Sequence, residues 1–319
     1  MGAAMNTLPE IPFAFTAERL DGFRQDQAWL AAALADPGTL FVPVRGGVNS
    51  YIWRDGTPHA LLLDAATAAP LRAADFCCVL LGEVNGKPCF ALGLDTDVVL
   101  PEARHDDLRS VSALLSYEDL GLLGYARAMV HWHRQHRYCG HCGALMQSAR
   151  AGHERKCGTC GMQWFPRIDP AIIVLVTDGN RALLGRQASW PKGRYSTIAG
   201  FVEHGETLEA AVAREVQEET NITVQAQRYV ASQPWPYPGS LMLGFRAEAL
   251  NSDIRNNDGE LEHAAWFTRD EIAHSVDKGL MMPPSRSISY RLIRGWFDEE
   301  AGRDFGALRH VDPNKAGKR

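Results

Sequence analysis

The chain has 319 residues, which is long enough for two domains. A composition of 45% hydrophobic and 22% charged residues is typical of a globular protein in water, and a net charge of −5 excludes a global basic field for nucleic acid, though not a local RNA contact. No apolar run approaches the length of a membrane span, and the first residues lack the basic start and apolar core of a signal peptide. We therefore expect a cytoplasmic protein without membrane contacts.

Residues 1 to about 130 have the pattern of an independent domain of mixed secondary structure. A short helix is expected over 26–35 and a longer one over 116–136. Strands are expected at four places: 40–44, 60–63, 76–81 and 88–92. Asn85 and Gly86 are expected to form the hairpin turn between the last two strands.

The seven cysteines divide into two groups. Cys77, Cys78 and Cys89 lie in apolar stretches, and we expect them to be buried strand residues. An odd total argues against a framework made only of disulfides. The other four form two Cys-x-x-Cys pairs: Cys139, Cys142, Cys157 and Cys160.

The two pairs indicate a zinc ribbon. A glycine after each pair permits a tight turn that directs backbone amides toward sulfur, and four thiolates suit tetrahedral Zn²⁺ in a closed, structural site. A redox pair is the alternative, but two matched turns favour zinc. A ribbon alone also suggests a nucleic-acid module, although the residues between the two pairs are only mildly basic.

The remaining chain predicts a second α/β domain. Strands are expected over five ranges: 171–176, 181–186, 225–232, 241–249 and 264–267. A helix is expected over 288–300 near the end of the chain. Between the second and third strands, the stretch 200–222 predicts a glycine turn that leads into a carboxylate-rich helix.

The carboxylates of this helix do not form an ordinary solvated face. At about 100° per residue, four apolar residues share one side of it: Leu208, Ala211, Val212 and Val216. Glu215 and Glu219 are four residues apart and stack on that same side. Two carboxylates beside a core need a cation or a proton, and Arg214 can neutralise only part of the charge. A hard divalent ion, Mg²⁺ or Mn²⁺, fits oxygen ligands best.

This stretch resembles the Nudix box. The matching residues are Gly200, Glu206, Arg214, Glu215, Val216, Glu218, Glu219, Asn221 and Ile222. Asn221 replaces the glycine of the family, a mild departure because we expect a left-handed residue to end the helix there. The resemblance implies an α/β (α+β) fold, a Nudix α/β/α sandwich preceded by a zinc ribbon and a small mixed N-terminal domain. It also implies an enzyme that splits diphosphates with these catalytic residues: Glu215, Glu218, Glu219 and Arg214.

The stretch 232–240, SQPWPYPGS, indicates which kind of substrate the enzyme binds. Its prolines hold Trp235 and Tyr237 in a stiff aromatic platform that suits a planar base, with a rigid loop packed on the core as the alternative. It resembles the motif of the NADH pyrophosphatases within the Nudix family, with Tyr237 in place of the usual Phe. The resemblance extends from about Arg109 to the end of the chain and is loose before it.

Further site residues follow from that resemblance alone. The carbonyl of Ala199 and the carboxylate of Glu260 are expected to join Glu215 and Glu219 on Mg²⁺ or Mn²⁺. Phe165 corresponds to a ring that reaches the site from a partner subunit, which implies a homodimer. The implied substrate contacts are Arg109, Phe165, Phe201, Gln233, Pro234, Trp235, Pro236, Tyr237, Pro238, Gly239, Ser240 and Ser289.

The resemblance implies hydrolysis of the diphosphate of NAD(H) to nicotinamide mononucleotide and AMP, and removal of NAD caps from RNA 5′ ends. One alternative is a Nudix hydrolase for ADP-ribose or dinucleoside polyphosphates. Another is a zinc-ribbon RNA-binding module with incidental hydrolase activity, against which the intact box speaks. The expected domains are 1–133, a ribbon at 134–166, and a Nudix domain at 167–319.

Overall fold

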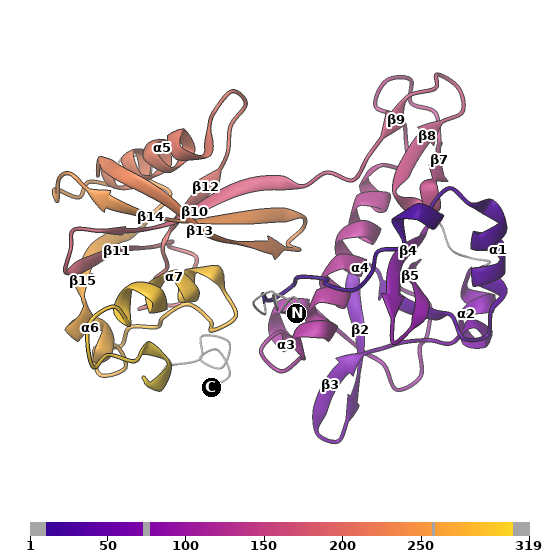
Figure 1. The fold of residues 1–319 in the computed structure, drawn as a ribbon, viewed down its shortest axis with the longest axis horizontal. Helices are drawn as coiled ribbons and strands as arrows, with labels where there is room; N and C mark the ends of the chain where they lie inside the picture. Colours follow the sequence, from indigo (N-terminus) through magenta and orange to yellow (C-terminus); the bar gives the residue numbers. More distant parts are fainter. Residues whose placement is uncertain (1–10, 73–76, 257–258, 309–319) are drawn as a thin grey trace, which may run out of the picture. The chain divides into compact units, whose positions relative to one another are not determined.

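A computed structural model describes residues 11–72, 77–256 and 259–308. The chain forms two compact units (Figure 1). The first extends to Ile168 and also includes the loop Pro234–Gly239, and the second comprises Asp169–Gln233 and the chain from Ser240 onward. Within the described ranges, no helix is long and apolar enough to cross a membrane.

The first unit contains a six-stranded sheet in the order β3-β2-β1-β5-β4, with β6 paired to β2. The strands are β1 Leu40–Arg45, β2 Val48–Arg54, β3 Thr57–Ala60, β4 Cys77–Val84, β5 Lys87–Leu94 and β6 Arg104–Asp106. The helices are η1 Asp21–Phe23, α1 Gln27–Ala35, α2 Ala65–Arg72, α3 Leu108–Val111 and α4 Tyr117–Gln135. β1 and β5 pair in parallel, whereas the hairpins β1-β2 and β4-β5 are antiparallel.

Both faces of this sheet are covered. Val42 and Ala91 pack toward α4, whereas their neighbours Phe41 and Phe90 pack toward α1 and α2. Strands buried on both faces are apolar without alternation, which is why β1, β4 and β5 were visible as continuous apolar runs. Cys77 and Cys89 are buried in β4 and β5 as expected, and Cys78 is half-buried.

The two predicted helices and the predicted hairpin turn of this unit are confirmed. Asp26 accepts from Trp29 N and caps α1, and Ser116 accepts from Asp119 N and caps α4. Asn85 and Gly86 join β4 to β5 with φ of 53° and 73°, the left-handed pair that a two-residue hairpin requires.

The predicted strand over 60–63 is wrong. Only Ala60 belongs to a strand, at the end of β3, and Leu63 makes an isolated bridge to Phe41. The true partner, β2, was missed because buried polar residues interrupt its apolar pattern. Asn49 is fully buried and donates from Nδ2 to Leu123 O at 2.9 Å. Position 76 of the predicted strand 76–81 lies outside the described residues.

The cysteine-containing segment forms a three-stranded sheet in the order β7-β8-β9. Its strands are β7 Met146–Ala149, β8 Glu154–Cys157 and β9 Gln163–Trp164, with the short turn η2 Arg150–Gly152 between the first two. Cys139, Met146 and Cys157 are the buried centre of this small sheet. A core this small needs additional cross-linking, as a bound metal provides.

The second unit is built on a sheet in the order β13-β14-β10-β11-β15, with β12 paired to β10. The strands are β10 Asp169–Thr177, β11 Arg181–Arg186, β12 Ile198–Phe201, β13 Val224–Trp235, β14 Ser240–Ala249 and β15 His263–Thr268. The helices are α5 Leu208–Thr220, α6 Arg269–Ala273, α7 Ile288–Phe297 and η3 Phe305–Ala307. The predicted strands and the two long helices of this region are confirmed, with ends that shift by at most three residues.

Strand β10 is the centre of this unit. Ile172 and Val174 pack with α5 on one face of the sheet, whereas Ile173 and Leu175 pack with α7 on the other. Figure 1 shows α5 and α7 on opposite sides of the sheet. The unit is therefore an α/β/α sandwich, and the predicted fold class is confirmed. The sandwich fixes α5 against β12, where the glycine turn begins.

Candidate active site

Helix α5 is held at both ends by its own sequence. Thr207 precedes it and accepts from Ala210 N at 3.2 Å, which satisfies one of the free N–H groups of the first turn. Asn221 ends it in the left-handed region with φ of 64°, as the sequence predicted. Asn221 Nδ2 also donates to Asp253 O at 3.1 Å, a bond that glycine could not make.

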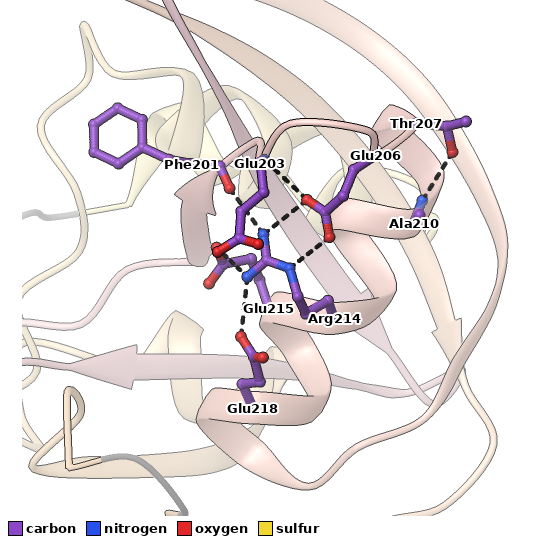
Figure 2. A network of polar contacts seen from close by, with 8 residues as sticks. All are labelled: Phe201, Glu203, Glu206, Thr207, Ala210, Arg214, Glu215 and Glu218. Atoms are coloured by element: carbon purple, nitrogen blue, oxygen red, sulfur yellow. Dashed lines mark hydrogen bonds and ion pairs between the residues drawn. The ribbon is translucent and has the colours of Figure 1, made fainter.

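Arg214 connects three carboxylates on one side of α5 (Figure 2). Its Nε and Nη2 donate to the two oxygens of Glu206 at 2.6 and 2.9 Å, a bidentate pair. Its Nη1 donates to Glu215 Oε1 and Glu218 Oε2, both at 2.9 Å, and Nη2 also donates to Phe201 O. All these bonds hold the guanidinium against protein oxygens, so Arg214 positions carboxylates.

The charge network has a clear electrostatic consequence for Glu206. The hydrogen bond from Arg214, supported by the backbone N–H of Glu203, lowers the pKa of Glu206 to about 2. The hydrogen bonds with Glu206, Glu218 and Glu215 raise the pKa of Arg214. Glu206 and Arg214 are therefore a fixed ion pair, and the chemistry belongs to the other carboxylates.

Glu215 lies directly over the backbone of Gly200. A Cβ at position 200 would lie 1.9 Å from Glu215 Cδ, so only glycine leaves room for this carboxylate. Burial raises the pKa of Glu215, Arg214 opposes that shift, and the negative charges of Glu218 and Glu260 add to it. A carboxylate whose pKa is raised by burial and by acidic neighbours is a site where binding of a cation is favourable.

The other predicted metal ligands lie on neighbouring elements. Glu219 is 4% exposed, one turn after Glu215 on α5. Ala199 is in β12 and pairs with Ile173, and Glu260 is exposed but close enough to raise the pKa of Glu215. Among the described residues, the carboxylates are not gathered as tightly as a set of three metal ligands. The glycine-lined space, the buried Glu219 and the raised pKa of Glu215 nevertheless fit a hard divalent ion.

The four cysteines do form a tight cluster. The Sγ atoms of Cys139, Cys142, Cys157 and Cys160 all lie within 4.8 Å of one another. Gly143 and Gly161, which follow the two pairs, have φ of 75° and 76° and donate N–H to the carbonyls of Cys139 and Cys157. Backbone N–H groups of Cys142 and His141 lower the pKa of Cys139. These matched turns bring together four cysteine sulfurs that can bind a metal ion.

The aromatic residues of the loop Pro234–Gly239 pack within the first unit. Trp235 and Tyr237 meet edge to face at 5.1 Å between ring centroids, and Phe13 packs against them at 5.8 and 5.7 Å. Arg109 lies over the Tyr237 ring, with Cζ 4.2 Å from its centroid, and Arg127 is at 5.3 Å. The loop is thus an aromatic cluster packed on the first unit, with two cations beside it.

Two predicted substrate contacts make internal hydrogen bonds instead of facing solvent. Gln233 is 2% exposed, accepts from Ile288 N at 2.7 Å and donates to Arg286 O at 2.9 Å, so it caps the start of α7. Ser289 is also 2% exposed, and its Oγ accepts from Ser196 Oγ, Thr197 N and Thr197 Oγ1. Both residues connect α7 to the sheet.

The remaining predicted contacts are more accessible. Phe201 is 60% exposed at the end of β12, and Phe165 is 55% exposed after β9. Ser240 begins β14 opposite Asp169 of β10. Sequence reasoning missed Phe13 and Arg127, which complete the aromatic cluster. Neither carries a local signal, because each reaches the loop only through the tertiary fold.

The chain matches two family models. One, described as a NUDIX domain, covers residues 167–289, and the other, described as an NADH pyrophosphatase-like rudimentary NUDIX domain, covers residues 22–132. The chain is 38% identical over 296 residues, 88% of its own length and 92% of the relative's, to a protein of Mycobacterium bovis. The chain therefore belongs to the Nudix hydrolase family.

The particular relatives carry a common name. The Mycobacterium bovis protein is named NAD-capped RNA hydrolase NudC, and so is a Stutzerimonas stutzeri protein that is 42% identical over 224 residues, 70% of this chain and 78% of that relative. Among solved structures, a Nudix hydrolase from Nitrosomonas europaea is similar, with a TM-score of 0.38, 25% identity and coverage of 42% of this chain and 79% of that one.

Proposed function

We propose that the protein hydrolyses the diphosphate of NAD(H) to nicotinamide mononucleotide and AMP, and removes NAD caps from RNA to leave a 5′-monophosphate. The observation that supports this most is the geometry of α5, where one arginine orients three carboxylates beside a buried fourth. The names of the relatives and the proline-rich aromatic loop support the dinucleotide as substrate.

The protein's own residues have separate tasks in this proposal. Glu215, Glu219, Glu260 and the carbonyl of Ala199 would hold Mg²⁺ or Mn²⁺, and the bound ion would neutralise the diphosphate and polarise its phosphorus. Glu218 is half-exposed and hydrogen-bonded only on Oε2 to Arg214 in the described part of the chain, so Oε1 is available to accept a proton from the attacking water. Arg214 fixes the geometry of Glu215 and Glu218.

The dinucleotide is bound by the remaining site residues. Trp235 and Tyr237 offer aromatic faces to a base, Arg109 offers a cation to a phosphate, and Phe201 contacts the nicotinamide ring. Gln233 and Ser289 contribute by fixing α7 and the start of the loop. This division assigns recognition to the loop and hydrolysis to α5.

The four-cysteine cluster binds Zn²⁺ as a structural ion in this proposal. We further propose a cytoplasmic homodimer, in which Phe165 of each subunit contributes to the site of the other. Apolar residues exposed on the ribbon support such an interface: Tyr138, Leu145, Met162 and Phe165. The domain boundaries proposed are 1–133, 134–166 and 167–319, and the two matched ranges, 22–132 and 167–289, lie within the first and the third.

A substrate panel tests the proposed activity. NADH, NAD-capped RNA, ADP-ribose and a dinucleoside polyphosphate are compared at equal concentration with Mg²⁺ and with Mn²⁺, and the products are separated by chromatography. Nicotinamide mononucleotide and AMP from NADH, with the highest kcat/KM for NADH or capped RNA, support the proposal. Faster hydrolysis of ADP-ribose than of either would assign the chain to the alternative substrate class.

A further inference from the structure

One face of α4 carries a row of basic side chains next to the aromatic loop. Arg127, His131 and Arg134 are spaced by four and three residues, so they project from the same side of the helix. All three are half-buried, neither fully solvated nor part of the core. Burial lowers the pKa of His131, and the positive charges of Arg127, His136 and Arg134 lower it further. The positive charges of Arg127 and Arg134 therefore both act at His131, in the middle of the row.

The row begins where the loop packs on α4. A Cβ at Gly124 would lie 3.2 Å from Pro236 and 3.3 Å from Phe13, so the loop crosses the helix at this glycine. Arg127, one turn further along, has Cζ 5.3 Å from the Tyr237 centroid. The loop, the helix and these contacts all belong to the first unit. The basic row is thus a continuation of the loop surface.

The polar groups at this junction have spare hydrogen-bonding capacity. The only ion pair of Arg127 among the described residues is with Asp107, at 3.5 Å, and Asp107 is itself half-exposed. In that part of the chain, neither Arg127 Nη1 nor Tyr237 Oη has a hydrogen-bond partner, although both atoms are buried. Arg109 adds a second cation over the same ring. Arg127 and Tyr237 therefore each have a donor that no described protein acceptor uses, and an anionic oxygen is the usual partner of such an arginine.

We propose that Arg127, His131 and Arg134 bind the phosphodiester backbone of the RNA that follows an NAD cap. The inference rests on the proposed function, which places the cap at the loop. From Arg127 to Arg134 the helix rises by about 10 Å, and a stacked strand carries one phosphate per roughly 3.4 Å along its axis, so the row spans more than one phosphate. A net charge of −5 repels RNA elsewhere, so a local basic row would confine the strand to this face.

The row distinguishes capped RNA from the free dinucleotide. Free NADH ends at the cap, so it reaches the loop but has no phosphate for His131 and Arg134. Arg134→Gln should therefore raise KM for a 20-nucleotide NAD-capped RNA by about fivefold with unchanged kcat, and Arg134→Glu by more, because losing a phosphate contact weakens binding without altering the reacting groups. Turnover of free NADH should stay within twofold, and Arg134→Lys should restore RNA use.

Binding of uncapped RNA tests the row independently of catalysis. Without divalent ions, the affinity of the full-length protein for a 5′-monophosphorylated 20-nucleotide RNA is measured by fluorescence anisotropy at several salt concentrations. Each phosphate contact contributes about 0.7 to the slope of log affinity against log salt for a single strand, so Arg134→Gln should flatten the slope by about that amount. Arg54→Gln, an exposed arginine at the end of β2 that loses the same charge, should leave it unchanged.

Several outcomes would overturn the proposal. A wild-type protein that does not bind the RNA, or an unchanged slope in Arg134→Gln, would show that the strand lies elsewhere. An equal loss on NADH and capped RNA, or a lowered melting temperature in Arg134→Gln, would mean that the arginine supports the fold. If the wild type binds the RNA through the row but hydrolyses neither NADH nor capped RNA, the proposed function fails while the RNA surface stands.

Discussion

At the scale of single residues, the pair Gly200 and Glu215 is the most constrained part of the candidate site. The carboxylate fills the space that a side chain at position 200 would occupy, with 1.9 Å between the added Cβ and Glu215 Cδ. Any side chain at position 200 would therefore displace the carboxylate of Glu215. The fixed spacing of the Nudix box thus has a steric cause at its first position as well as a chemical one at its acidic positions.

Gly200→Ala should abolish most activity without unfolding the protein. Displacing a catalytic carboxylate by about 1 Å costs about a hundredfold in rate, so we expect kcat/KM for NADH to fall by at least that factor. Gly295→Ala is the control, because a Cβ there would meet no described atom within 4 Å and alanine is the better residue inside α7 by up to about 1 kcal/mol. An active Gly200→Ala enzyme would contradict the placement of Glu215.

The residues of the box could be predicted from sequence because their spacing alone puts them on one helix face. By contrast, the hydrogen-bond partners of Gln233 and Ser289 could not be predicted from the sequence. Motif resemblance placed both at the substrate, but their hydrogen bonds go to Ile288 N and to Thr197, which are close only in the folded chain. A motif identifies positions that matter and does not distinguish a residue that touches substrate from one that holds such a residue.

At the scale of elements, the ribbon depends on its two cysteine turns. Its buried centre is three residues, and two of them are the candidate metal ligands Cys139 and Cys157. A sheet of this size lacks a sufficient apolar core, so we expect binding of a metal ion to supply most of its stability. The geometry around each thiolate is repeated almost identically in the two turns, with φ of 75° and 76° at the glycines.

Removing the metal should therefore destabilise the first unit. We expect about one zinc per chain by elemental analysis, and a fall in melting temperature on the order of 10 °C in Cys139→Ser or after treatment with a strong chelator. Cys78→Ser is the matched control, since Cys78 is half-buried in β4 and apart from the cluster. A zinc-free protein with an unchanged melting temperature would refute a structural metal.

At the scale of the whole molecule, two neutral histidines tie the ribbon segment to the rest of the first unit. His133 Nε2 donates to Gly152 O and His153 Nε2 donates to Leu80 O, both at 2.7 Å. Burial lowers the pKa of each histidine to about 4, against an ordinary value of 6.5, despite the opposing effect of these hydrogen bonds. Each is therefore neutral in the folded protein at neutral pH.

This burial predicts a loss of stability in mild acid. Below pH 6.5 the unfolded chain takes up protons that the folded chain binds only near pH 4, so the free energy of unfolding should fall between these values. The slope is at most about 1.4 kcal/mol per pH unit for each histidine. Urea denaturation at pH 7, 6 and 5 measures it, and His133→Gln with His153→Gln should flatten it. Equal stability at pH 7 and 5 in the wild type would be incompatible with neutral buried histidines.

Much of the architecture was predictable because its central strands are apolar on both faces. β10 appeared as a continuous apolar run, and β11 was predicted with the bounds that the structure gives. β2 was not predictable, since its buried Asn49 is satisfied by a carbonyl 74 residues away. The aromatic cluster around Tyr237 was foreseen only in part, because Phe13 and Arg127 reach it through the fold.

The central claim is that the buried carboxylates of α5 drive metal-dependent hydrolysis of NAD(H), and one comparison tests it most directly. The kcat/KM for NADH with saturating Mg²⁺ or Mn²⁺ is measured for the wild type and for Glu219→Gln, which keeps the size of a side chain that is 4% exposed and removes its charge. We predict that the wild type produces nicotinamide mononucleotide and AMP. In the variant, kcat/KM for NADH should fall by more than about a hundredfold, which is more than the loss expected for a residue that only supports a metal ligand. A folded Glu219→Gln protein that hydrolyses NADH within a few-fold of the wild type would contradict the account.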